Sequence, residues 1–148
     1  MSSDEVLVSQ ARSGNLAAFV EFATRWWPVI ARVAWSLLGN APQALAVTEE
    51  VLDTALCSRD SCEEPVRFSM YRLAIWLAFA RRRSGPRPDG MTSMDRAAVT
   101  LRDVEDVPVA EAAAILGISA EEIRMRVQRA RMALINAREG SAPAARPG

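Results

Sequence analysis

The chain contains no histidine and no lysine, and only two of its 148 residues are cysteines. Without histidine, the side chain that most often transfers protons in catalysis at neutral pH is absent. Cys57 and Cys62 alone cannot supply the four ligands of a tetrahedral zinc site. The sequence also has no glycine-rich loop that cradles phosphates and no convincing pair of catalytic carboxylates. We therefore expect no enzymatic activity, no cofactor and no bound metal.

Long apolar runs are also missing. No stretch approaches the ~20 consecutive apolar residues that a membrane-spanning helix needs. Residues 1–5 include two acids and no base, whereas a secretory signal peptide begins with basic residues. The sequence thus predicts a cytoplasmic protein that makes no contact with a membrane.

Acidic and basic residues are segregated along the chain, although the 18 arginines balance 18 acids overall. Residues 1–64 carry 4 arginines against 9 acids, and residues 65–88 carry 6 arginines and no acid. Residues 89–120 are acidic again (2 against 6), and residues 121–148 are basic (6 against 3). Arginines that cap helix C-termini would explain either basic block alone. Two separate blocks favour two basic surfaces.

Apolar residues recur at intervals of three and four along most of the chain, and no alternating run indicates a strand. The pattern predicts helices over residues 4–11, 16–38, 66–83, 94–101 and 120–137, with others starting near Pro42 and Pro108. Pro28 lies inside the second of these and is expected to kink or split it. In the helix at 66–83, the apolar side is assigned to Phe68, Tyr71, Ile75, Trp76 and Phe79.

Two prolines and two glycines mark residues 84–93 as a linker. The predicted fold class is therefore all-α, with two small helical domains at residues 1–83 and 94–138 joined by this short linker. Residues 139–148 consist mostly of small residues and proline, and we expect them to form a disordered tail.

Residues 107–134 have the anatomy of a helix-turn-helix. An alanine-rich helix is followed by a tight turn at Gly117, with Ser119 as the N-cap of a longer helix. The predicted buried stripe of that helix is Ile123, Val127, Ala130 and Leu134. Arginines flank the opposite face, as suits contacts to DNA phosphates. An ordinary helical hairpin with a solvated arginine face fits the same spacing.

Four segments of this C-terminal region form a recognisable set: Leu101-Arg102-Asp103-Val104-Glu105, Ala110-Glu111, Ile115-Leu116-Gly117-Ile118-Ser119 and Arg126-Val127-Gln128-Arg129-Ala130-Arg131. They closely resemble the promoter-binding domain of extracytoplasmic-function (ECF) sigma factors. The N-terminal half resembles the family's other domain more diffusely, through Gly14-Asn15, Leu38-Gly39-Asn40, Glu50-Val51, Tyr71-Arg72-Leu73-Ala74 and Arg81-Arg82-Arg83. The resemblance extends over residues 4–138 and implies a dissociable subunit of RNA polymerase.

Core RNA polymerase and promoter DNA are the partners that the resemblance implies, and an anti-sigma factor is a further candidate. In this family the N-terminal domain binds the polymerase clamp and opens the DNA, and the C-terminal domain reads the upstream promoter element. Carried over, the DNA-facing candidates of the last helix are Arg124, Met125, Arg126, Gln128, Arg129 and Arg131. The strand-opening side would hold Tyr71, Arg72, Trp76, Arg81, Arg82 and Arg83. Tyr71 and Trp76 also fit as core residues.

The polymerase contact is predicted on the acidic face of the third helix, at Glu49, Glu50 and Asp53. There the family usually has an acidic pair, then Gln-Glu and a phenylalanine. The corresponding residues here are Leu45, Ala46, Glu49, Glu50 and Leu52, and only Glu50 matches. In the last helix, Glu122 replaces the usual threonine.

The linker is also short, because about ten residues reach at most ~36 Å when fully extended. The family's two promoter elements lie more than one DNA turn apart, and one turn is ~34 Å. The sequence therefore leaves two hypotheses open. One is a working ECF-like sigma factor, and the alternative is a degenerate sigma-like protein that acts as an interaction module without promoter initiation.

Overall fold

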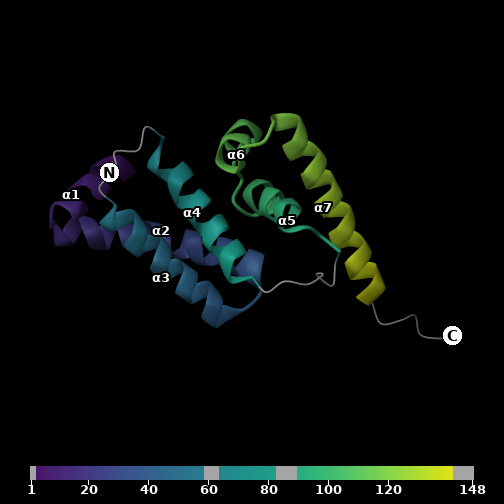
Figure 1. The fold of residues 1–148 in the computed structure, drawn as a ribbon, viewed down its shortest axis with the longest axis horizontal. Coiled ribbons are helices and arrows are strands. Elements are labelled where there is room, and N and C mark those ends of the chain that lie inside the picture. The colour runs from purple at the N-terminus through teal and green to yellow at the C-terminus, as the bar shows by residue number, and fades with distance from the viewer. Residues whose placement is uncertain (1–2, 59–63, 83–89, 142–148) are drawn as a thin grey trace. The chain divides into compact units, whose positions relative to one another are not determined.

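The computed structural model describes residues 3–58, 64–82 and 90–141, and every regular element in these ranges is a helix (Figure 1). The predicted all-α class is therefore confirmed. The chain divides into two compact units, an N-terminal unit at Met1–Arg82 and a C-terminal unit at Arg83–Gly148. The predicted linker lies largely outside the described residues, which resume at Gly90.

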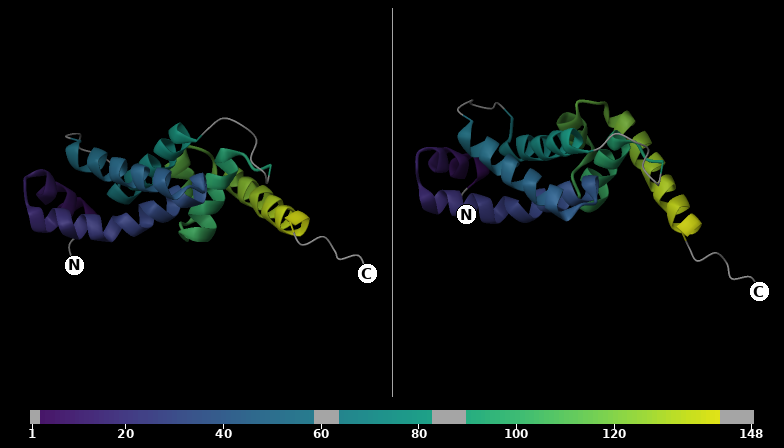
Figure 2. Two further views of the ribbon diagram at one scale, coloured as in Figure 1. Left: turned by 90° about the horizontal axis from the view of Figure 1, so that it is seen from below. Right: turned by 60° about the horizontal axis from the view of Figure 1, so that its bottom comes forward.

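The described helices of the N-terminal unit are α1 (Asp4–Arg12), α2 (Leu16–Leu38), α3 (Ala41–Cys57) and α4 (Val66–Arg81). Helices α2 and α3 run antiparallel and side by side (Figure 2). They are joined at Gly39, which ends α2 with a φ of 63°, in the left-handed region that favours glycine. The core is filled by apolar side chains that are fully buried, among them Phe22, Ile30, Val47, Met70 and Ile75.

Helix α2 continues unbroken through Pro28, so the expected split of this helix is wrong. Proline removes the backbone hydrogen bond to residue 24, but Pro28 and Thr24 both lie on the exposed side, where water replaces it. On the opposite side, Phe22, Trp26 and Ile30 are buried on both sides of the proline. The packing of α2 against α1, α3 and α4 holds its two halves in one helix.

The predicted inner face of α4 needs correction. Its fully buried residues are Met70, Ala74, Ile75 and Ala78, whereas Trp76 is 45% exposed. Small side chains suit this face because they let α4 approach its neighbours closely, and the large aromatic rings remain at the sides. Helix α4 also ends at Arg81 instead of Arg83, and Arg82 is extended. Arg83 lies outside the described residues.

The C-terminal unit contains α5 (Ser93–Val99), a π-helical turn η1 (Thr100–Val104), α6 (Val109–Leu116) and α7 (Ala120–Ser141). The single helix predicted at 94–101 is thus a short α-helix that continues into π geometry. Ile123, Val127 and Ala130 are buried as predicted, but Leu134 is 40% exposed. The apolar packing at this end of α7 passes through Ala130 and Ala133, against Met91 and Val99. Helix α7 extends past the predicted end at residue 137, so residues 139–141 are helical.

Candidate nucleic-acid interface

Helices α6 and α7 form a helix-turn-helix (Figure 1). Gly117 ends α6 with a φ of 70°, and the side chain of Ser119 accepts a hydrogen bond of 3.0 Å from the backbone nitrogen of Glu122. The glycine and the serine cap therefore set the turn and the start of α7 as predicted from the sequence. Ile115 of α6 and Ile123 of α7 are fully buried, which fixes the second helix on the first.

One face of the first two turns of α7 is exposed to solvent. Residues at positions i, i+3, i+4 and i+7 lie on the same side of a helix. Glu121, Arg124, Met125 and Gln128 have this spacing, and all four are exposed. Within the described part of the chain, Arg124 and Gln128 make no ion pair or side-chain hydrogen bond. Three of the predicted DNA-facing residues, Arg124, Met125 and Gln128, therefore share this face.

Arg126 points into the unit instead of toward solvent. Its guanidinium lies 2.8 Å from the buried carboxylate of Asp95 on α5 and 3.1 Å from Glu122, one helical turn earlier. Burial disfavours the charged form of Arg126, but the hydrogen bonds that its guanidinium donates to Asp95 and Glu122 outweigh this effect and raise its pKa. This predicted DNA contact is thus part of the internal structure of the unit.

Arg129 and Arg131 are exposed but have acidic neighbours. Arg129 lies 3.5 Å from Asp95. Arg131 makes two hydrogen bonds to the carboxylate of Asp103 on η1, of 2.9 and 2.6 Å. The bond to Arg131 lowers the pKa of Asp103, and Asp103 raises the pKa of Arg131. An acid within hydrogen-bond distance reduces the positive charge that an arginine presents to DNA.

The basic end of α4 belongs to the N-terminal unit. Arg81 lies 3.0 Å from Glu50 of α3, so one predicted DNA contact is paired with one predicted polymerase contact. Arg72 forms an ion pair with Glu64. Trp76 meets Phe79 edge to face, with ring centroids 5.3 Å apart, and leaves part of its indole exposed. The expectation that Trp76 is a core residue is wrong, and its ring is accessible for stacking.

Tyr71 is half-buried and meets Trp26 edge to face at 5.7 Å. It therefore contributes to packing more than Trp76 does.

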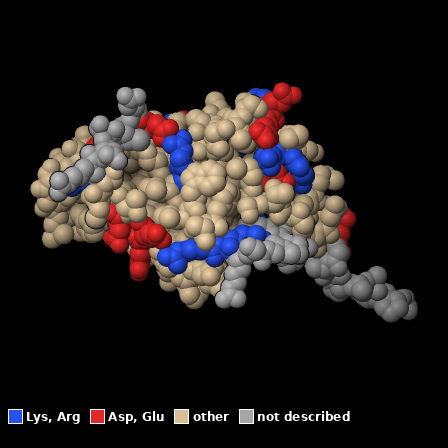
Figure 3. Space-filling view, viewed as in Figure 1, with Lys and Arg blue, Asp and Glu red and all other residues tan. Residues whose placement is uncertain are grey.

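The other two acids of the predicted polymerase contact, Glu49 and Asp53, are exposed on α3. Figure 3 shows acidic and basic side chains next to one another in several places on the face in view. The segregation of charge along the sequence is therefore partly cancelled by pairing.

Helix α1 is fastened to the three other helices of its unit by polar side chains. Asp4 accepts hydrogen bonds from Arg25 (2.8 Å) and from the indole nitrogen of Trp26 (3.0 Å), both on α2. Glu5 accepts one of 3.0 Å from the backbone nitrogen of Val66, at the start of α4. Arg12 donates two, of 3.1 and 2.7 Å, to the carbonyl of Ala55 in the last turn of α3. The contacts of Glu5 and Arg12 satisfy backbone groups that have no hydrogen-bond partner within their own helix.

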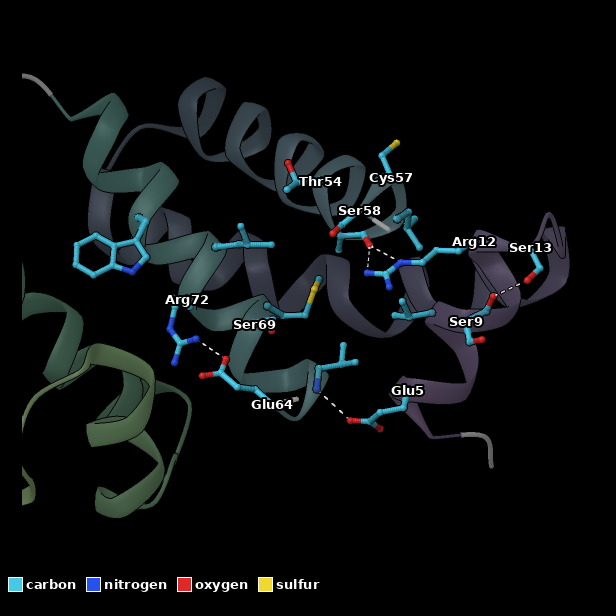
Figure 4. A pocket seen from close by; sticks show the side chains of 17 residues that line it. Glu5, Ser9, Arg12, Ser13, Thr54, Cys57, Ser58, Glu64, Ser69 and Arg72 are labelled. Atoms are coloured by element: carbon cyan, nitrogen blue, oxygen red, sulfur yellow. Dashed lines mark hydrogen bonds and ion pairs between the residues drawn. The ribbon is translucent and has the colours of Figure 1, made fainter. Parts of the chain in front are cut away.

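A groove of about 1280 Å³ is bounded by α1, the end of α3 and α4 (Figure 4). The charged side chains in it are largely engaged in the contacts just described: Arg12 with Ala55, Glu5 with Val66 and Arg72 with Glu64. The charged side chains of the groove are therefore occupied by these contacts, whereas the free thiol of Cys57 also lines it. In the part of the chain that the structure describes, no three acidic or cysteine side chains are placed to hold a metal ion.

Sequence reasoning missed the acids that hold the arginines of α7, namely Asp95 and Asp103. Thr92 caps the backbone nitrogen of Asp95 at 3.1 Å, and this capping pattern is readable as Thr-x-x-Asp in the sequence. The pattern signals a helix start, but it does not show that the carboxylate reaches α7.

None of the described helices is long and apolar enough to cross a membrane.

Residues 90–134 match the family model described as "Sigma-70, region 4". Comparison with curated protein sequences finds no significant match. Among solved structures, the chain resembles CnrH in its complex with the cytosolic domain of CnrY. The TM-score is 0.78 at 23% sequence identity, and the match covers 95% of this chain and 100% of that one. These findings support the resemblance drawn from the sequence: residues 90–134 match a sigma-70 region 4 domain, and the chain shares the all-helical fold of CnrH.

Proposed function

We propose that the protein is an ECF-like sigma factor that binds core RNA polymerase and directs initiation at specific promoters. The observation that carries the proposal is the combination, in one chain, of a region 4 helix-turn-helix with a fold shared with CnrH over 95% of its length. Residues 1–83 would bind polymerase and open the DNA, and residues 94–138 would bind the upstream promoter element across the linker at 84–93. Such a protein acts on the chromosome, so its proposed location is the cytoplasm.

Contacts to the upstream element are proposed from α7. Arg124 is exposed and supplies a positive charge for a phosphate, and Gln128 on the same face has both a donor and an acceptor for a base edge. Arg129 is exposed as well. Arg126 is excluded from this set because its guanidinium is held by Asp95 and Glu122. Strand opening is assigned to the exposed indole of Trp76, together with the arginines that end α4.

The polymerase contact is proposed at Glu49 and Asp53, because both carboxylates are exposed and neither pairs with another described residue. Glu50 is a weaker candidate, since binding through it must first displace Arg81. CnrH was solved with the cytosolic domain of CnrY. This supports an anti-sigma factor as a further partner of the present chain.

The alternative is a sigma-like interaction module that does not start transcription. One specific observation favours it. Arg126 and Arg131 of α7 are paired with acids of their own unit, so fewer arginines are available to DNA than the sequence analysis predicts. The departures at Leu45, Ala46 and Leu52 from the family's polymerase contact point the same way.

Co-purification of the tagged protein with core RNA polymerase, followed by run-off transcription from its own upstream region, separates the two functions. A polymerase complex and a specific transcript are expected. The double variant Glu49→Ala/Asp53→Ala should lose most of the polymerase, whereas Glu139→Ala, which removes an exposed acid of the other unit, should not. Polymerase that fails to co-purify even at low salt contradicts the sigma-factor function. Binding without a transcript leaves the interaction module.

A further inference from the structure

The carboxylate of Asp95 on α5 contacts two arginines of α7, one with each oxygen. Its Oδ1 lies 2.8 Å from Nη1 of Arg126, and its Oδ2 lies 3.5 Å from Nε of Arg129. The Asp95 side chain is only 2% exposed, and Thr92 caps its backbone nitrogen at 3.1 Å. The structure therefore holds a fixed, buried carboxylate against the middle of α7.

Arg129 differs from Arg126 in what remains available of its guanidinium. The Arg129 side chain is 52% exposed, whereas that of Arg126 is 22% exposed. Asp95 pairs with Arg129 at Nε, and no other described residue bonds to the two terminal nitrogens of Arg129. Terminal guanidinium nitrogens form the fork with which arginine binds a phosphate through two parallel hydrogen bonds. Arg129 can therefore be held at one end of its guanidinium and bind a ligand with the other.

Arg129 lies at the edge of the exposed face of α7. It follows Met125 by four residues, so it is on the same side of the helix one turn later. In a helix-turn-helix, the N-terminal residues of the second helix meet base edges. An arginine at the margin of the face, further along the helix, is placed for the DNA backbone. A long side chain loses rotational freedom when it binds, and one that is already held loses less.

The negative charge of Asp95 opposes this gain only in part. Arg126 lies closer to the carboxylate than Arg129 does, so it takes the larger share of that charge. Arg129 thus keeps most of its positive charge for a phosphate. Shielding and positioning have opposite signs: neutralising Asp95 strengthens DNA binding if shielding dominates and weakens it if positioning dominates.

We propose that Asp95 is a positioning residue for DNA binding, which holds Arg129 at Nε so that the terminal nitrogens of its guanidinium meet a phosphate of the promoter backbone. This inference rests on the proposed function, because it assumes that α7 binds DNA. It gives α5, which lies outside the helix-turn-helix, a part in DNA affinity.

The test is fluorescence anisotropy of the full-length chain with a labelled duplex from its own upstream region, over a series of salt concentrations. Circular dichroism checks that each variant is folded. Asp95→Asn is expected to weaken binding about 2- to 10-fold, which is the cost of ordering one long side chain. The slope of log affinity against log salt concentration should stay the same, because the phosphate contact still forms. Arg129→Ala should lower that slope by about one, and Asp95→Asn should have no further effect in its background.

Two further variants complete the test. Asp103→Asn is the matched control, because it removes an acid from another arginine of the same helix and should leave DNA affinity unchanged or higher. Arg129→Lys keeps the charge and leaves the buried carboxylate in place, but an ammonium lacks the planar fork that joins Asp95 to a phosphate. It should weaken binding by a similar factor with the slope kept, and it decides alone if Asp95→Asn does not fold.

Affinity of Asp95→Asn equal to or above that of the wild type would show that the acid only shields Arg129, and this overturns the inference. Wild-type affinity in Arg129→Lys overturns it as well. Equal weakening by Asp95→Asn with and without Arg129, or an equal loss in Asp103→Asn, also overturns it, because such a loss does not pass through Arg129. These outcomes leave the proposed function intact, whereas failure of the wild-type chain to bind the duplex even at low salt overturns both.

Discussion

The carboxylate of Asp95 lies 2.8 Å from the guanidinium of Arg126, and the two residues join α5 to α7. The Asp95 side chain is only 2% exposed, so its negative charge has almost no access to water. Arg126 in turn reaches Glu122, which places an acid, a base and a second acid in one connected group. This group holds α7 against the rest of its unit.

Removing the charge of Asp95 should therefore destabilise the C-terminal unit. Asp95→Asn leaves Arg126 with a neutral neighbour in a partly buried site, and a loss of about 2–4 kcal/mol in the free energy of unfolding is expected. All four tryptophans, at positions 26, 27, 35 and 76, lie in the N-terminal unit. Urea unfolding followed by far-UV circular dichroism should thus show the loss, whereas tryptophan fluorescence should change little. Superimposable dichroism curves for variant and wild type would contradict this role of Asp95.

Acid should weaken the contact between η1 and α7. The hydrogen bond from Arg131 lowers the pKa of Asp103 from its ordinary 3.8, against the opposing effect of burial. A carboxyl whose folded pKa is lowered contributes stability above its unfolded pKa, and this is lost as the pH falls through the folded value. Urea unfolding by circular dichroism should show a stability loss below about pH 4 that is smaller in Asp103→Asn. Equal losses in the two proteins would show that the Asp103–Arg131 pair contributes nothing.

Arg124 should contribute more to DNA affinity than Arg131 does. Arg124 has no acidic partner among the described residues, whereas Arg131 is held by Asp103. Arg124→Ala is expected to reduce the slope of log affinity against log salt concentration by about one, because one counterion fewer is released. Arg131→Ala should reduce it less. Fluorescence anisotropy with a labelled duplex over a series of salt concentrations measures both slopes, and a larger change for Arg131→Ala would reverse the assignment.

Trp76 should bind single-stranded DNA by stacking. Trp76→Ala is expected to weaken binding of a single-stranded oligonucleotide roughly 5- to 100-fold, as loss of one stacked base does. The stability cost should be about 1 kcal/mol, because the variant loses mainly the edge-to-face contact with Phe79. Trp35→Ala is the control, since Trp35 is similarly exposed but lies on α2. Equal loss of binding in both variants would mean that single-stranded DNA does not stack specifically on Trp76.

Glu5 should stabilise the start of α4. Its carboxylate caps the backbone nitrogen of Val66, and Pro65 before it offers no side-chain cap. Glu5→Ala is expected to lower the free energy of unfolding of the N-terminal unit by about 0.5–1 kcal/mol. Glu5→Gln keeps an acceptor oxygen and should cost less. Tryptophan fluorescence during urea unfolding compares the two variants, and identical losses would argue against capping by the Glu5 oxygen.

Local signals in the sequence were sufficient for much of the fold. Asn15, Gly39 and Ser119 begin or end helices where predicted, because capping depends on residues three or four positions away. Contacts over longer separations were not predictable in this way. Arg126 and Asp95 are 31 residues apart, and Arg131 and Asp103 are 28 apart.

The candidate site was therefore predicted only in part. The sequence shows which helix carries the arginines, and only the tertiary structure shows which of them are already paired. The misassignment of Trp76 has a related cause. Hydrophobicity alone favours burial of the largest ring, but close approach of α4 to its neighbours requires small side chains such as Ala74 and Ala78 on the inner face.

The position of α1 has a consequence for synthesis of the protein on the ribosome. Helix α1 leaves the ribosome before α2, α3 and α4, but the groups to which Asp4, Arg12 and Glu5 bind belong to residues near 25, 55 and 66. The last of these contacts joins residues 61 positions apart, so it must wait several seconds at the usual rate of about 5–20 residues per second. During that interval the apolar residues of α2 have no complete core to enter. The core of the N-terminal unit therefore stays incomplete on the nascent chain until α4 has emerged.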